Sequence, residues 1–174
     1  MMNIHLLKKT FYKTLFPPKF GNKKIQSLYN FVSQNDSDTE YWTLDGPLKE
    51  FIRIIKSFDE NDIQYFFERI NLWNSYYLVI ISDKFLDSHV REHVKYDLGK
   101  IYAKIFLLYE VSDPYFLIDN LEIAVTMYDS KIDTATLIDL ISKIEFMHHK
   151  KLITRQQRNY NIQFISSLTD EISN

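Results

Sequence analysis

Residues 74–109, NSYYLVIISDKFLDSHVREHVKYDLGKIYAKIFLLY, form the densest apolar stretch of this chain. The short run Tyr76–Ile81 is also compatible with a buried strand, but its apolar neighbours keep the 3.6-residue period of a helix, so we expect a helix. A second stripe, with apolar side chains every three or four positions, predicts one long helix that begins at Asp87 or Ser88. Its members are Val90, Val94, Leu98, Ile101, Ile105 and Leu108. Gly99 interrupts this stripe, which a closely packed neighbouring helix would explain.

Helical periodicity extends over the rest of the chain, and no segment requires a strand. Pro47 and Pro114 stand at expected helix starts, where proline loses no hydrogen bond. Two pairs have the spacing of a capping box, Ser130 with Asp133 and Thr154 with Gln157. Outside 74–109, the helical pattern covers 3–15, 23–33, 47–55, 59–73, 113–128, 133–147 and 154–172. The pattern predicts an all-α fold of about seven or eight helices in a single domain, 1–174, arranged as a helical bundle or as stacked antiparallel helix pairs.

Amino-acid composition indicates the cellular compartment in which we expect this protein. Hydrophobic residues make up 45% of the 174 residues, so a packed core is expected. The chain has no cysteine, which removes disulfides, thiolate nucleophiles and cysteine-based zinc sites and fits a reducing cytoplasm. The longest apolar run, Tyr76–Ile81, is far shorter than the roughly 20 residues that a membrane span needs. We therefore expect a cytoplasmic protein with no membrane partner.

Charge is unevenly distributed, although the net charge is only −2. Residues 1–34 carry six lysines and no acid, 35–147 carry 11 basic and 21 acidic residues, and 148–169 carry four basic residues and no acid. The pattern includes a basic amphipathic N-terminal segment at 1–20 and an acidic loop at 35–46. Solvated helix faces would produce it, and so would an acidic surface that faces a basic partner.

One cluster has the residues of a zinc site. His89, Glu92 and His93 match the H-x-x-E-H pattern of inverted zinc peptidases, in which two histidines four residues apart bind zinc and the glutamate acts as a base. A third ligand would have to come from Glu110 or Glu122, which no supporting motif marks. The alternative is a pair of partly exposed histidines on the first turns of a helix. Since P-loop, G-x-G-x-x-G and G-x-S-x-G sequences are absent as well, we expect no enzyme, no metal and no cofactor.

A basic cluster lies near the C-terminal end. It contains His148, His149, Lys150, Lys151, Arg155 and Arg158. Such a cluster binds phosphate in some proteins, but cations also gather near the C-terminus of a helix for electrostatic reasons. A nucleic-acid-binding or phage-encoded regulatory protein that uses the basic N- and C-terminal segments is therefore an alternative. The net charge of −2 argues against dedicated nucleic-acid binding.

Two runs carry a resemblance to known proteins: DKFLDSHVREHVKYDLGKI at 83–101 and SDPYFLIDNLEIA at 112–124. They resemble the helix–turn–helix units of small HEAT-like proteins. Over 74–128 the chain is similar to all-helical immunity proteins of bacterial polymorphic and contact-dependent toxin systems. The matching positions are His89, Glu92, Leu98, Asp113, Pro114, Leu121 and Ala124. The extension to Tyr109 and the basic N-terminal segment depart from that pattern.

The resemblance implies a non-enzyme that binds and blocks one cognate protein toxin in the cytoplasm. Acidic side chains would then imitate the toxin's nucleic-acid or phosphate ligand. We expect the contacts at exposed acids of the loop and of a nearby helix start, where they reach a partner without disturbing the core. These candidates are Asp36, Asp38, Glu40, Asp59, Glu60 and Asp62.

Overall fold

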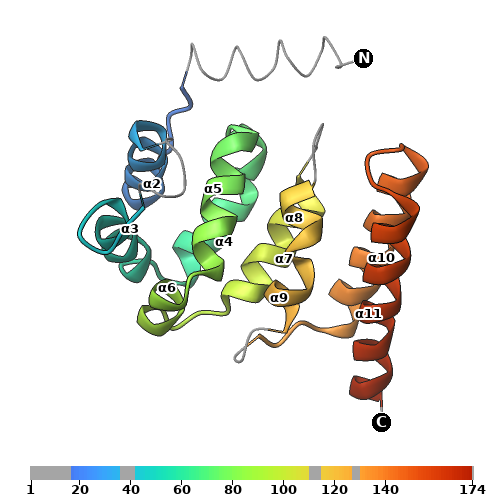
Figure 1. Cartoon of the computed structure of the whole chain (residues 1–174). Coiled ribbons are helices and arrows are strands. Elements are labelled where there is room, and N and C mark those ends of the chain that lie inside the picture. The colour runs from blue at the N-terminus through green and yellow to red at the C-terminus, as the bar shows by residue number, and fades with distance from the viewer. Residues whose placement is uncertain (1–16, 36–41, 110–114, 127–129, 174) are drawn as a thin grey trace. The chain divides into compact units, whose positions relative to one another are not determined.

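The chain is all-helical in the computed structural model (Figure 1). The structure describes residues 17–35, 42–109, 115–126 and 130–173. Within these ranges it contains ten α-helices, one 3₁₀ turn and no strand, which confirms the expected all-α class. The chain separates into two compact units, Met1–Tyr96 and Asp97–Asn174. The single domain expected for 1–174 stays a prediction.

The first unit packs its helices around buried aromatic rings. Its elements are α2 (Lys23–Gln34), α3 (Pro47–Lys56), α4 (Glu60–Glu68), the 3₁₀ turn η2 (Ile70–Leu72), α5 (Ser75–Leu86) and α6 (Ser88–His93). The Trp73 ring lies 5.1 Å from that of Tyr29 and 5.3 Å from that of Phe66, measured between centroids. These contacts join α2, α4 and the start of α5. The run Tyr76–Ile81 lies in α5, so the helix expected there is confirmed.

The single long helix expected from Asp87 or Ser88 onward is wrong. The chain ends α6 at His93 and begins α7 (Leu98–Leu108) separately. Asp97 is the N-cap of α7, and its carboxylate accepts a hydrogen bond from a backbone N–H of the first turn, 2.8 Å away. An aspartate at this position satisfies a free helical donor, so it gives α7 its own start. The boundary between the two units falls at the same place.

The second unit contains an antiparallel hairpin of its two longest helices (Figure 1). Its elements are α7, α8 (Tyr115–Asp119), α9 (Leu121–Val125), α10 (Thr134–His149) and α11 (Arg155–Ser173). The apolar stripe expected over 133–147 consists of Leu137, Leu140, Ile141, Ile144 and Met147. All of these are buried in α10 except Ile141, which is half-buried. One continuous helix over 113–128 is wrong, because the chain breaks at Asn120 between α8 and α9.

The second unit packs closely at Gly99. A Cβ atom added there would lie 2.3 Å from the Ala124 carbonyl oxygen and 2.4 Å from the Ser130 Oγ. No side chain fits such a gap, and the first of these atoms is backbone. The close neighbour expected from the glycine is therefore confirmed, and it is the chain of α9.

The helix starts follow the capping signals in part. Thr154 and Gln157 form the expected reciprocal box at α11, with the Gln157 N–H donating to Thr154 Oγ1 at 3.1 Å and the Thr154 N–H donating to Gln157 Oε1 at 3.0 Å. At α10, Asp133 is itself the N-cap and accepts from the Thr136 N–H at 2.9 Å. The box expected between Ser130 and Asp133 is therefore wrong.

Three expected features lie outside the described residues: the helix at 3–15, the helix start at Asp113 and Pro114, and half of the acidic loop, 36–41. Over the ranges that are described, no helix combines the length and the apolarity that crossing a membrane requires.

Candidate partner-binding site

Two of the expected acidic contacts lie together at the start of α4. Asp59 is the N-cap and its side chain is 61% exposed. Glu60 is the first helical residue, is exposed, and forms no ion pair with a described side chain. Both carboxylates therefore face solvent on one short segment. Asp59 and Glu60 are called the acidic edge from here on.

Asp62 was expected to be exposed as well, and that expectation is wrong, because the residue is only 5% exposed. Its carboxylate accepts hydrogen bonds from the Asn22 Nδ2 at 2.7 Å and from the Lys24 Nζ at 2.6 Å. It also accepts the Asp59 N–H at 2.9 Å, while the Asp59 carboxylate accepts the Asp62 N–H at 3.1 Å. The charge of Asp62 is thus used within the fold, where it joins the starts of α2 and α4.

The pKa of Asp62 reflects two opposing effects. Burial alone would raise it, but the hydrogen bonds from Lys24, from Asn22 and from the Asp59 N–H, together with the Lys24 charge, lower it below the usual range. The Asp62 hydrogen bond likewise raises the pKa of Lys24. Burial, with a smaller contribution from the Asp62 charge, raises the pKa of Tyr96. The first two directions keep Asp62 ionised and Lys24 protonated at neutral pH, and the third keeps the Tyr96 hydroxyl neutral.

The acidic edge is held rigidly by these contacts. The capping box fixes the Asp59 backbone and carboxylate, and Asp62 anchors the box to α2. Lys24 lies 3.7 Å from Asp59 and 2.6 Å from Asp62, so it offsets part of their charge. Glu60 has no such partner among the described residues and carries the uncompensated negative charge of the edge.

The remaining candidates, Asp36, Asp38 and Glu40, lie outside the described residues. The two residues that flank this undescribed range contact each other, because the Trp42 Nε1–H donates a hydrogen bond to the Asn35 carbonyl oxygen at 3.2 Å. Asn35 follows the C-terminal end of α2, whereas the acidic edge lies beside its N-terminal end. A helix of 12 residues is about 18 Å long, so Asn35 and the acidic edge are separated by roughly the length of α2.

The histidine pair lies on the exposed side of α6. The His89 Nδ1 lies 3.1 Å from a carboxylate oxygen of Asp87, and the His93 Nδ1 lies 2.7 Å from the His89 carbonyl oxygen. No group of three potential metal ligands occurs among the described residues. Glu110 lies outside them, and Glu122 accepts a hydrogen bond from the Tyr160 hydroxyl. The zinc alternative therefore has no supporting third ligand in the described part of the chain.

The basic cluster lies at the turn of the α10–α11 hairpin (Figure 1). Arg158 forms an ion pair with Glu145, and its Nε donates a hydrogen bond to a carboxylate oxygen of Glu145 at 2.8 Å. Lys150, Lys151 and Arg155 are exposed, and none forms an ion pair with a described carboxylate. Three of the four cations in 148–169 are thus available to an external anion.

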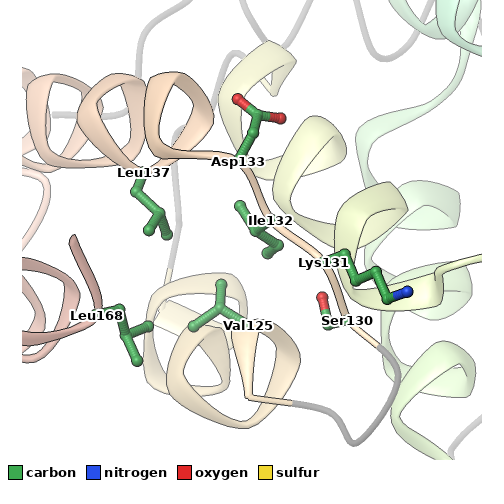
Figure 2. Close-up of a pocket in the computed structure, with 7 residues that line it drawn as sticks. All are labelled: Val125, Ser130, Lys131, Ile132, Asp133, Leu137 and Leu168. Atoms are coloured by element: carbon green, nitrogen blue, oxygen red, sulfur yellow. The ribbon is translucent and has the colours of Figure 1, made fainter. Parts of the chain in front are cut away.

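A pocket of about 460 Å³ lies in the second unit (Figure 2). Four aliphatic side chains from separate elements surround it: Val125, Ile132, Leu137 and Leu168. The charged ends of Lys131 and Asp133 point away from those four side chains (Figure 2). The sequence carries no signal for this pocket, because its wall comes from positions spread over some 40 residues without a common period.

Comparison of the chain with protein-family models, with curated proteins and with solved structures finds no match. Function is therefore inferred from the chemistry and placement of the described side chains.

Proposed function

We propose that this protein is a non-catalytic binding protein of the cytoplasm, an immunity protein that neutralises one cognate toxin. The acidic edge covers a basic surface of that toxin. The observation that carries the proposal is Glu60, an exposed carboxylate that forms no ion pair within the described ranges and lies next to Asp59, whose carboxylate the capping box holds. The resemblance of 74–128 to immunity proteins is the reason for choosing a toxin as the partner.

Physical chemistry favours such an edge as a contact. A fixed charge loses less conformational entropy on binding than a mobile one, so it contributes more to affinity. Opposite charges also steer the two proteins together and disfavour partners of the same sign. The first effect acts through Asp59, whose carboxylate the capping box holds, and the second acts through both Asp59 and Glu60. Asp62 is buried and supports the capping box.

The test is co-expression of this chain with a candidate toxin from a neighbouring gene, scored by growth. Glu60→Lys reverses the uncompensated charge and is expected to abolish protection. Glu68→Lys is the matched control, since Glu68 is exposed at the other end of α4 and bonds only the Gln64 amide, at 3.0 Å. Protection that survives Glu60→Lys, or that Glu68→Lys removes equally, contradicts the proposal.

Glu60 is a better probe than its neighbours. Replacing Asp59 removes the N-cap and costs about 1 kcal/mol of stability, which would confuse a binding defect with a folding defect. Replacing Asp62 removes the acceptor shared by Asn22, Lys24 and the Asp59 N–H, which would also lower stability. Glu60 has neither role. As a first-turn acid of α4 it interacts favourably with the helix dipole, so Glu60→Lys is expected to cost about 0.3–1 kcal/mol.

A further inference from the structure

The outward face of α10 carries two large apolar side chains that are exposed to solvent. Ile138 is 54% exposed and Phe146 is 52% exposed, and α10 is the one described helix with two such side chains. Single exposed apolar residues are ordinary on a protein surface, whereas apolar residues grouped on one face are a feature of interaction sites. The outward face of α10 is therefore a candidate surface for a second molecule.

Ile138 and Phe146 belong to one row of α10, with Ser142 between them, because the three residues are spaced four apart. Rows with this spacing are one of the ridges through which helices pack against each other. Ser142 is small, and its hydroxyl donates a hydrogen bond to the Ile138 carbonyl oxygen at 3.1 Å, so covering it leaves no unpaired donor. The row of Ile138, Ser142 and Phe146, called the outward row from here on, can thus be desolvated at little polar cost.

Opposite charges border the outward row on the same side. At about 100° per residue around a helix, Asp139 lies about 60° and Lys150 about 80° from Ser142 in the same direction. The Lys150 Nζ lies 5.5 Å from the centre of the Phe146 ring, so its charge stands at the height of that ring. Asp139 and Lys150 are exposed, and neither forms an ion pair with a described side chain. Both charges are thus available to a partner.

An antiparallel pair of helices centred on Ser142 matches these groups. A two-fold axis perpendicular to the plane of the two helices places Ile138 of one copy at the height of Phe146 of the second, since each is four residues from Ser142. Residues on one side of the row stay on that side of the pair, so Asp139 of each copy approaches Lys150 of the other. Parallel packing would bring Asp139 to Asp139 and Lys150 to Lys150, and like charges disfavour that arrangement.

The remaining residues of the outward face fit the same pair. Glu145 lies about 60° from Ser142 on the other side of the row, and its charge is offset by the ion pair with Arg158 of α11. Toward the ends of the face, the exposed His149 lies seven residues after Ser142, and the exposed Ala135 lies seven residues before it. The two-fold axis places each of these over the other, so the bulkier side chain lies above the smallest one.

We propose that the second unit binds a second copy of this chain through the outward row of α10, as an antiparallel and two-fold symmetric pair. One face supplies both members of every contact, which is why the occupant is a second copy. This interaction is separate from the acidic edge of the first unit and does not depend on it. A helix of 16 residues is about 24 Å long and about 10 Å wide, so the pair covers roughly 240 Å² per copy, against about 800 Å² in a stable complex. The dimer is therefore transient, with a dissociation constant on the order of 100 μM.

The test is sedimentation equilibrium of the full-length chain from about 10 μM to about 1 mM. The average mass should rise with concentration from the 20.9 kDa of one chain toward twice that value. Ile138→Gln with Phe146→Gln removes the apolar part of the outward row and should keep the protein monomeric, with its melting temperature unchanged because both side chains are exposed. Ile123→Gln is the matched control, since Ile123 is 53% exposed on α9 of the same unit, and it should leave the dissociation constant within about a factor of two.

A charge exchange tests the antiparallel register. Asp139→Lys alone, or Lys150→Glu alone, places like charges at both symmetric contacts and should weaken the dimer roughly tenfold. The two substitutions together restore opposite charges and should return the dissociation constant to within about threefold of the wild type, a recovery that non-specific association would not give. The proposal is overturned if the protein is monomeric at the highest concentration, if the double glutamine variant and Ile123→Gln associate equally, or if the charge exchange gives no recovery.

Discussion

Asp62→Asn is the substitution that best separates folding from binding. It keeps the size of the side chain and removes the charge that accepts hydrogen bonds from Asn22, Lys24 and the Asp59 N–H, at 2.7, 2.6 and 2.9 Å. An asparagine offers one acceptor oxygen and turns its NH₂ group toward a donor. Hydrogen bonds to charged groups contribute about 1.5–3 kcal/mol each. Because Asn22 and Lys24 can turn to water, we expect the variant to lose about 2 kcal/mol in total.

Urea denaturation at pH 7 and at pH 3, followed by circular dichroism, measures this loss. The pKa of Asp62 is lower in the folded state than the ordinary value of about 3.9, so its contribution is fully present above that value and is lost as the pH falls through the folded pKa. Asp62→Asn should therefore be less stable than the wild type at pH 7, and the difference should shrink at pH 3. The melting temperature at pH 7 should fall by roughly 4–8 °C.

Glu60→Gln is the control for this experiment. It removes a neighbouring carboxylate that is exposed and unpaired among the described residues, so the free energy of unfolding should change by no more than about 0.5 kcal/mol. The reasoning is refuted if Asp62→Asn is as stable as Glu60→Gln at pH 7. It is also refuted if the deficit of Asp62→Asn persists undiminished at pH 3.

Three further predictions concern stability and metal. Gly99→Ala should lower the melting temperature. The added methyl group would meet a backbone oxygen 2.3 Å away, and overpacking of about 1–3 kcal/mol outweighs the gain of about 1 kcal/mol in helix propensity. A variant as stable as the wild type contradicts this prediction. Tyr96→Phe removes the hydroxyl that donates to the Ile55 carbonyl and should cost about 1 kcal/mol in urea denaturation, so an unchanged midpoint counts against that bond. Chelation with EDTA should leave the melting curve unchanged, and a midpoint lowered in the wild type but not in a His89→Ala, His93→Ala variant would show that these histidines hold a metal.

Most of the helices were predictable because periodicity and caps are local properties. The buried stripe of α10 and the capping box of Thr154 and Gln157 depend on residues three or four positions apart, and both are confirmed. The break before α7 was also marked locally, by Asp97. Its cap was missed because the apolar period of the long stripe continues unchanged through Leu98.

The candidate site was less predictable, because burial depends on distant partners. Asp62 occupies the third position of a helix, where an exposed acid is normal. Its partners Asn22 and Lys24 lie 40 and 38 positions away along the chain, so no local pattern reveals that they enclose it. Asp59 has the same residue type at nearly the same place and is exposed. The distinction arises from the packing of α2 against α4.

The dissociation constant of the purified protein for its cognate toxin tests the central claim most directly. Glu60→Lys should weaken binding roughly tenfold or more, since it replaces an attractive charge contact with a repulsive one, and higher salt should reduce the difference. Glu68→Lys, on the same helix, should bind within about a factor of two of the wild type. Equal affinities for the two variants would contradict the assignment of the acidic edge as the contact surface.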